Sequence, residues 1–224
     1  MNQDKIWDYL QNDSSQSFDG SHSRLNTLVK KFTQKEKVLN IGVGSGVFEK
    51  LSTAYGLEVY SLDPSEKSID KIKSFLGDEK AKVGYSQSIP FESDYFDGVI
   101  MSEVLEHLDN EIIIKTLDEV RRVLKKGGKF IGTVPYKENL TEQIVICPQC
   151  GEVFHRWGHI QSFDIPRVSN LLATSFQNTQ AETKMYISWN TLNWKGKFSA
   201  FFSYILFKLG LKENGLNIYL KGTK

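Results

Sequence analysis

Short apolar runs alternate with amphipathic stretches along the first 135 residues of the chain. Runs rich in Val, Ile and Leu predict strands buried on both faces, and apolar residues spaced by three and four predict helices that cover them. The predicted strands are 38–41, 57–62, 81–85, 96–101 and 129–134. The predicted helices are 22–32, 47–55, 65–76 and 111–124. This alternation predicts an α/β fold with a doubly wound, mostly parallel sheet.

The regular alternation stops after Pro135, and the segment 137–163 contains both cysteines. We therefore predict an inserted Cys/His loop after the fifth strand. A helix at 164–175 and strands at 183–188 and 216–220 would complete a seven-stranded sheet. We expect one domain over 1–224, with an N-terminal helical segment at 1–34 and an aromatic helical segment at 190–212.

Composition narrows the class of protein. The 224 residues are 40% hydrophobic and 25% charged, and the formal net charge is +1, which is ordinary for a globular chain and predicts no stable nucleic-acid partner. Two cysteines argue against a disulfide framework. We find no apolar run of about 20 residues and no signal-peptide pattern, so we expect a cytoplasmic protein.

A glycine-rich loop, Gly42, Gly44 and Gly46, follows the first predicted strand. Glycines allow a tight turn and a close approach of the backbone to a ligand, although a strand–helix turn without a ligand would also explain the loop alone. Asp63 ends the next predicted strand, where a carboxylate can accept hydrogen bonds from both ribose hydroxyls. The third glycine comes one residue earlier than in the nicotinamide fingerprint, which favours S-adenosylmethionine, a ligand without phosphate.

Four successive strings resemble the motifs of Rossmann-like (class I) S-adenosylmethionine-dependent methyltransferases with a type 11-like domain, a group that includes ubiquinone- and sugar-modifying enzymes. The strings are LNIGVGSG, VYSLDPS, SIPFESDYFDGVIMSEVLEHL and LDEVRRVLKKGGKFIGTVP. The resemblance covers about residues 35–136, and it implies a transferase (EC 2.1.1.-) whose final strand is antiparallel.

The resemblance also implies contacts with the cofactor. By position, the three glycines line its methionine and ribose part, Asp63 holds the ribose, Ser86 and Gln87 meet the adenine, and Glu103 lies beside the cofactor. The sequence departs from the family at two positions. Asn40 replaces the acid of the first strand and would still hydrogen-bond the loop, and Tyr85 replaces the acid that meets the adenine amino group.

The inserted segment has the spacing C-x2-C-x4-H-x3-H, formed by Cys147, Cys150, His155 and His159. Two thiolates and two imidazoles can fill a tetrahedral zinc site. Unligated thiols on a surface loop are the alternative, and so is a loop ordered by its cysteines in which a histidine does chemistry. Because the loop leaves the carboxyl end of a strand, it should overhang the transferred methyl group. His159 is then the natural general base, and His155 or His107 would serve if zinc occupied His159.

Glu103, Glu106 and His107 are spaced to share one helical face. Together with His159 they resemble the metal-binding set of small-RNA 2′-O-methyltransferases. The alternative is a loop–helix junction that borders the cofactor, and the nearly neutral charge argues against an RNA substrate.

The stretch Phe198–Leu211 has ten apolar residues in fourteen and is too short to span a membrane. Trp194 and three lysines flank it. A lid packed on the sheet, a homodimer contact and peripheral docking on a membrane near a lipid-linked substrate are all open.

These features predict methyl transfer from S-adenosylmethionine to a hydroxyl of a small molecule, a sugar or a lipid-linked glycan. A non-catalytic module that binds S-adenosylmethionine is one alternative, because Asn40 and Tyr85 depart from the family. An RNA 2′-O-methyltransferase that uses a divalent metal is the other.

Overall fold

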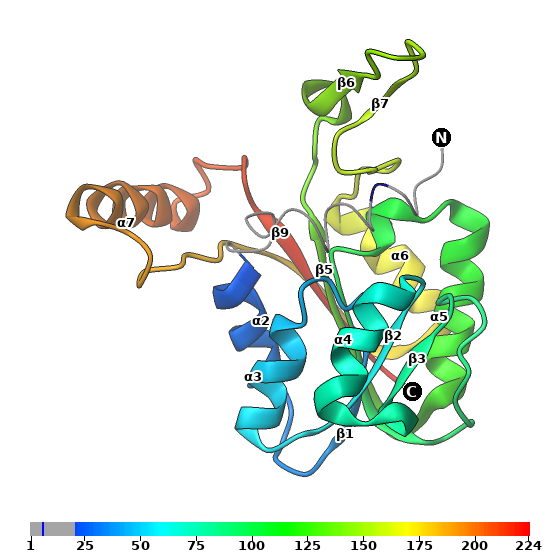
Figure 1. The fold of residues 1–224 in the computed structure, drawn as a ribbon. Coiled ribbons are helices and arrows are strands. Elements are labelled where there is room, and N and C mark those ends of the chain that lie inside the picture. The colour runs from blue at the N-terminus through cyan, green and yellow to red at the C-terminus, as the bar shows by residue number, and fades with distance from the viewer. Residues whose placement is uncertain (1–5, 7–20) are drawn as a thin grey trace.

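The computed structural model describes Ile6 and residues 21–224, and its centre is a seven-stranded sheet with helices on both faces (Figure 1). The strand order is β3-β2-β1-β4-β5-β9-β8. Strand β9 is antiparallel to both of its neighbours, and the other pairs are parallel. The strands are β1 Lys37–Ile41, β2 Glu58–Asp63, β3 Ala81–Val83, β4 Phe96–Ser102, β5 Leu124–Pro135, β8 Gln177–Lys184 and β9 Asn217–Thr223. The predicted doubly wound α/β fold is confirmed.

Two apolar clusters fix the helices to the two faces of the sheet. The larger helices are α2 His22–Val29, α3 Val47–Tyr55, α4 Glu66–Leu76, α5 Asn110–Val123, α6 Ile165–Ser175 and α7 Trp194–Lys208. Helices α2 and α3 pack with Val38 and Ile100 on one face. Helices α5 and α6 pack with Leu39 and Val99 on the other. Consecutive residues of a strand therefore pack against helices on opposite faces of the sheet. Because both faces are buried, these strands are apolar throughout.

Side-chain caps fix where four of the helices begin, among them α7, whose cap is Asn193. The side chain of Ser65 accepts a hydrogen bond from the backbone N–H of Ser68 at the start of α4, as its sequence position predicts. The side chains of Asp109 and Asp164 cap α5 and α6 in the same way. These caps satisfy amides that have no partner within the helix. Short 3-10 turns follow at η2 Asp78–Lys80, η3 Leu105–His107 and η4 Leu140–Gln143.

Several predicted boundaries were wrong; the helix predicted at 22–32 ends at Val29, and the strand predicted at 216–220 is Asn217–Thr223. Strand β8 begins at Gln177 directly after α6 and ends at Lys184, whereas a strand at 183–188 was predicted. Its residues QNTQAETK lie on the sheet edge without an apolar alternation, so the pattern gave no signal. Strand β5 begins at Leu124 and includes the glycines that were expected to end the preceding helix. Strand β3 ends at Val83 rather than Tyr85.

The predicted insertion forms a hairpin that projects from the body beyond the end of β5 (Figure 1). Its antiparallel strands are β6 Ile144–Ile146 and β7 Val153–His155. Of the predicted N-terminal helical segment, α2 lies within the described residues, and positions 1–5 and 7–20 lie outside them. None of the helices in the described part of the chain is long and apolar enough to cross a membrane.

Candidate active site

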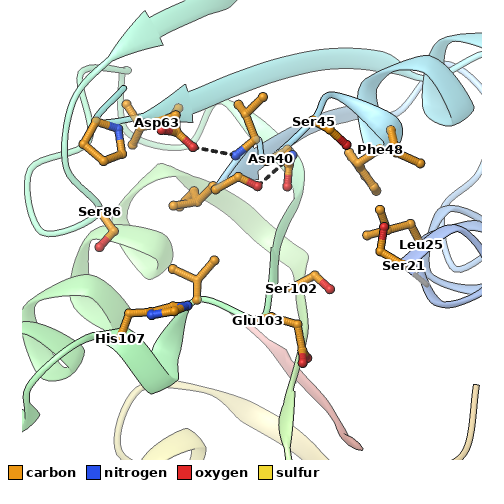
Figure 2. A pocket seen from close by; sticks show the side chains of 18 of the residues that line it. Ser21, Leu25, Asn40, Ser45, Phe48, Asp63, Ser86, Ser102, Glu103 and His107 are labelled. Carbon is orange, nitrogen blue, oxygen red and sulfur yellow. Dashed lines mark hydrogen bonds between the residues drawn. The ribbon is translucent and has the colours of Figure 1, made fainter. Parts of the chain in front are cut away.

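A cavity of about 560 Å³ lies at the carboxyl ends of β1, β2 and β4, where the strand order reverses (Figure 2). In open α/β sheets this point is where ligands bind. Its wall includes the glycine loop, the strand ends at Asp63 and Glu103, part of α2, and the histidine side formed by His107, Glu138, Trp157 and His159. Residues far apart in the sequence therefore share one cavity.

The glycine loop follows the cavity wall in a conformation that requires glycine. Gly42 has φ +87°, and a Cβ atom on it would lie 2.6 Å from Cγ2 of Val104. Gly46 begins α3 with φ +77°, and a Cβ atom there would lie 2.8 Å from Cδ1 of Ile72. Gly42 and Gly44 line the cavity, whereas Gly46 lies behind it. The loop therefore presents bare backbone to a ligand.

Asp63 is buried at the end of β2 and lines the cavity (Figure 2). Its Oδ2 accepts a hydrogen bond from the backbone N–H of Val43 (2.8 Å), and its Oδ1 accepts one from that of Ser65 (2.9 Å). These two donors fix the carboxylate against the glycine loop. The predicted ribose acid and the predicted loop are thus in direct contact.

A buried carboxyl group that the sequence reading missed lies behind Asn40. The Nδ2 of Asn40 donates to Oε1 of Glu49 (2.7 Å), and the Oγ of Ser61 donates to the same oxygen (2.9 Å). Burial raises the pKa of Glu49 to about 7. Helix α3 therefore supplies an acid next to the strand position where the family has its own. Its signal in the sequence was the i,i+3 spacing of Glu49 and Ser52 on a buried helix face.

The adenine side predicted from the resemblance is assembled in part. Tyr85 and Ser86 line the cavity, and Gln87 is absent from the described residues of its wall. The hydroxyl groups of Ser86 and Thr116 lie 2.8 Å apart in a buried hydrogen bond. Ser86 is therefore held by α5, with its backbone at the cavity.

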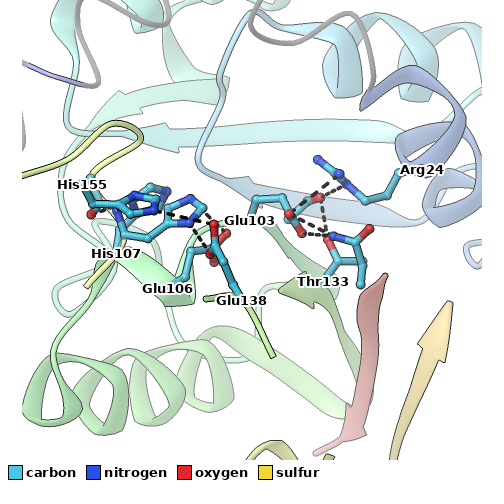
Figure 3. Close-up of polar contacts among 11 residues, drawn as sticks. Arg24, Glu103, Glu106, His107, Thr133, Glu138 and His155 are labelled. Carbon is cyan, nitrogen blue, oxygen red and sulfur yellow. Dashed lines mark hydrogen bonds and ion pairs between the residues drawn. The ribbon is translucent and has the colours of Figure 1, made fainter. Parts of the chain in front are cut away.

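Glu103 joins three elements at the end of β4 (Figure 3). The Nδ2 of Asn217 lies 3.1 and 3.0 Å from its two carboxylate oxygens, and Nη1 of Arg24 lies 3.8 Å from Oε2. Its backbone has φ +59°, a left-handed conformation that is strained for a residue with a side chain. The sequence reading missed Arg24 and Asn217, because each reaches Glu103 from an element distant along the chain.

Three histidines and two glutamates converge beside the cavity (Figure 3). Nδ1 of His159 lies 2.5 Å from Oε2 of Glu138, and Nδ1 of His107 lies 3.2 Å from the carbonyl oxygen of Gly158. The backbone N–H of His159 donates to Nδ1 of His155 (3.2 Å). His107, Glu138 and His159 line the cavity, whereas His155 and Glu106 lie behind them.

Comparison with known proteins identifies the fold that carries this cavity. Residues 39–132 match the family described as a methyltransferase domain. An uncharacterised protein of Methanocaldococcus jannaschii is 30% identical over 143 residues, 63% of this chain and 59% of the relative. An uncharacterised methyltransferase of Anoxybacillus flavithermus is 29% identical over 114 residues, 51% of this chain and 53% of the relative. The chain thus matches somewhat more than half the length of these two relatives.

A solved structure shares the fold over almost the whole chain. It is the 1,6-didemethyltoxoflavin-N1-methyltransferase of Burkholderia thailandensis, with a TM-score of 0.68 and 13% identity, covering 99% of this chain and 86% of that one. Over residues 39–132 the chain is therefore similar to the methyltransferase-domain family, and it shares its α/β fold with this solved methyltransferase. The glycine loop and Asp63 lie within these matched residues, whereas Glu138, His155 and His159 lie outside them.

Buried ionisable groups surround the three histidines beside the cavity. Glu106 is fully buried, and neither carboxylate oxygen has a hydrogen-bond partner among the described residues. Burial raises its pKa well above the usual range, and Glu103 adds to this effect. Burial, followed by the proximity of His159, lowers the pKa of His107 to about 3. His107 is therefore neutral at ordinary pH, with an imidazole nitrogen suited to accept a hydrogen bond or to bind a metal ion rather than to take up a proton.

Two sets of side chains in the described part of the chain bring ligand atoms within 4.8 Å of one another. One is Glu106, His107 and His159, and the other is Glu138, His155 and His159. Neither set includes a cysteine. Each set offers nitrogen and oxygen donors, a combination that suits several divalent cations.

The four-ligand zinc set predicted from the Cys/His spacing is not assembled. Cys147 and Cys150 lie at the tip of the hairpin, where the backbone N–H of Cys147 donates to the carbonyl of Glu152 (2.8 Å). His155 pairs with Ile144 at the base. Three residues of extended strand separate it from Glu152, about 10 Å. Hairpin pairing therefore separates residues that are close in sequence, and the structure joins His155 and His159 to Glu138 instead.

Proposed function

We propose that the chain is an enzyme that transfers the methyl group of S-adenosylmethionine to a hydroxyl of a small molecule, a sugar or a lipid-linked glycan. One observation carries the proposal: a single cavity joins the glycine loop and Asp63 to the pair His159–Glu138. The first end would hold the cofactor, and the second would receive the acceptor. Because both ends open into the same cavity, the arrangement supports a reaction by positioning, in which both reactants are held in line.

In this reaction the acceptor oxygen attacks the methyl carbon, the carbon–sulfur bond breaks, and sulfur keeps the electron pair as S-adenosylhomocysteine. The proton of the hydroxyl passes to His159. Glu138 holds Nδ1 of His159 at 2.5 Å, so Nε2 is the nitrogen that would accept this proton. A carboxylate in that position also stabilises the imidazolium that forms. His155 supports the backbone of His159, and His107 packs against its ring at 4.8 Å.

The test begins with calorimetric titration of S-adenosylmethionine and S-adenosylhomocysteine. A panel of hydroxyl acceptors is then screened for release of S-adenosylhomocysteine. We expect His159→Ala to lower kcat by a factor of about 10² to 10⁴ with cofactor affinity unchanged. His22→Ala, an exposed histidine on α2, is the matched control. Cofactor binding without turnover on any acceptor would favour the non-catalytic module, and absence of cofactor binding would reject both.

A second candidate mechanism is favoured by Glu106, because two buried carboxylate oxygens without hydrogen-bond partners are an arrangement that a cation would satisfy. Glu106, His107 and His159 would then hold a divalent cation, which lowers the pKa of an acceptor hydroxyl. Glu138 would orient His159 as an outer carboxylate, and Gly158 would orient His107. A ribose 2′-hydroxyl of RNA is the acceptor class that accompanies this candidate.

Metal removal separates the two mechanisms. If His159 acts as a base, turnover survives dialysis against EDTA. If the cation acts, turnover is lost and returns with Mn²⁺ or Mg²⁺, and Glu106→Gln abolishes the return. Glu142→Gln, an exposed glutamate of η4, is the matched control.

A further inference from the structure

The outward face of α7 is apolar and aromatic over its full length. No residue of this helix, all fifteen of which the structure describes, is buried. Trp194, Phe198 and Leu209 are exposed by 74%, 64% and 65%. Six exposed apolar positions recur at intervals of three and four and so share one face, and the exposed Tyr204 and Leu206 lie to either side of it. The six are Trp194, Phe198, Phe201, Phe202, Ile205 and, one residue past the helix, Leu209. Contiguous apolar patches of this kind mark sites of interaction.

The inward face of α7 is different. Gly196, Ala200, Ser203 and Phe207 are half-buried and also recur at intervals of three and four. Three of these four side chains are small, and the helix lies apart from the sheet in Figure 1. The sequence suggested apolar residues around the whole helix, and the structure turns most of the large ones to solvent.

The charges around α7 are all positive. Residues 194–212 contain Lys195, Lys197, Lys208 and Lys212 and no Asp or Glu. The Nζ of Lys195 lies 5.6 Å from the ring centroid of Trp194, and that of Lys208 lies 5.5 Å from the ring of Tyr204. A lysine beside an aromatic ring can pack its apolar stem against an apolar surface while its ammonium group reaches an anionic edge of that surface.

We infer that α7 docks on a membrane surface that contains anionic lipids. The aromatic face would enter the boundary between headgroups and acyl chains, and the four lysines would meet lipid phosphates. A helix of fifteen residues is about 22 Å long, so it lies in the plane of the surface rather than crossing the bilayer. The four charged side chains of this stretch are all positive, which favours anionic lipid over a second copy of the same helix, because two such helices would repel each other.

The position of α7 relates this surface to the cavity. The helix connects the carboxyl end of β8 to the start of β9, so it emerges at the edge of the sheet that carries the cavity (Figure 1). In the connection, the carbonyl of Ile187 accepts a hydrogen bond from Oγ of Ser23 (2.9 Å), and Ser23 lies between the cavity-lining residues Ser21 and Arg24. Docking would therefore bring the wall of the cavity formed by α2 close to the lipid surface. That an acceptor enters from this side rests on the proposed function, whereas docking itself does not.

The test is co-sedimentation of the full chain with phosphatidylcholine vesicles that contain or lack phosphatidylserine, at low and high salt. We expect binding to the anionic vesicles, weaker at high salt. Phe198→Ser/Phe201→Ser/Phe202→Ser should lower the partition coefficient at least tenfold. Lys195→Gln, Lys197→Gln and Lys208→Gln should each lower it about fivefold. Emission of Trp194 should shift to the blue on binding, and Trp194→Phe should remove that shift.

Matched variants on other surfaces serve as controls. Phe75→Ser replaces an exposed aromatic residue of α4, and Lys30→Gln/Lys50→Gln/Lys126→Gln removes three exposed charges elsewhere. Both should bind vesicles like the unchanged protein.

The inference is overturned if the folded protein binds no anionic vesicles at low salt, or if the controls weaken binding as much as the α7 variants. A concentration-dependent dimer that the α7 variants abolish, without vesicle binding, would show that a second copy covers this face. Calorimetric affinity for S-adenosylmethionine, measured on the same variants, tests the cofactor site separately.

Discussion

At the cofactor end of the cavity, the buried carboxylate of Asp63 is held by the backbone amides of Val43 and Ser65. Behind the wall of that end, Oε2 of Glu49 and Oγ of Ser52 have no hydrogen-bond partner among the described residues. At the acceptor end, the polar side chains come from three separated segments, and Glu106 has no hydrogen-bond partner among the described residues. The first end is arranged before any ligand binds. The second retains buried groups whose hydrogen bonds are not made, an arrangement that lowers stability unless something else satisfies them.

This difference indicates that the two ends of the cavity suit different kinds of ligand. A cofactor of constant shape needs one rigid cradle, and the backbone amides that hold Asp63 provide it. The acceptor end depends on an insertion and on loop residues, which is where substrate choice is usually encoded. Four variants, ordered from the largest expected effect to the smallest, test whether a change at one end of the cavity leaves the other end unaffected.

Asp63→Ala should have the largest effect, confined to the cofactor end. Loss of an ionised acceptor for two ribose hydroxyls should weaken S-adenosylmethionine binding about a thousandfold, measured by calorimetry. Asp70→Ala, an exposed acid on α4, is the control. Equal affinity in Asp63→Ala and the unchanged protein would mean that the ribose is held elsewhere.

Glu49 should make stability depend on pH. Its carboxyl group titrates near pH 7 in the folded protein and near 4.5 when unfolded, so the folded state holds the extra proton between these values. Stability should therefore fall as pH rises from about 4.5 to about 7, by up to about 3 kcal/mol. Glu49→Gln should flatten this dependence in urea unfolding between about pH 5 and about pH 8.

Glu66→Gln, which changes an exposed glutamate at the start of α4, should retain the dependence. An unchanged pH slope in Glu49→Gln would mean that the burial of Glu49 does not set the pH response of the cofactor end.

Gly42→Ala tests the contact between the two ends, because its Cβ atom would meet Val104 at 2.6 Å. Gly210→Ala is a close match, since Gly210 also has positive φ but no atom within 4 Å of a Cβ. We expect a loss of about 1 kcal/mol for Gly210→Ala from the left-handed backbone, and about 2 to 3 kcal/mol for Gly42→Ala, where overpacking adds to it. Equal losses in thermal unfolding would show that Val104 moves aside freely.

Cys147→Ser/Cys150→Ser should have the smallest effect. The cysteines lie at the hairpin tip, so unfolding free energy should change by less than about 0.5 kcal/mol, and metal content by elemental analysis should not change. His155→Ala, at the buried base of the same hairpin, should be clearly more destabilising. Loss of bound zinc in the cysteine variant would instead support the ligand set expected from the sequence spacing.

The cofactor end was the more predictable of the two for a physical reason. Gly42, Asp63 and the strands between them are joined by short connections, so periodicity and spacing imply their proximity. Glu49 was missed because an acid in an amphipathic helix usually faces solvent, and its burial depends on Asn40 and Ser61 across the helix–sheet contact.

The sequence by itself determined the parallel sheet, the glycine loop and the acid that faces it, because local backbone preferences and apolar periodicity act over short distances. Only the tertiary structure decided which groups accompany the histidines. The spacing grouped His155 and His159 with Cys147 and Cys150. In the structure an extended hairpin separates the cysteines from these histidines, and Glu138 and Glu106 lie beside the histidines instead. The same holds for α7, whose composition is apolar on many sides and whose exposure depends on the position of the helix apart from the sheet.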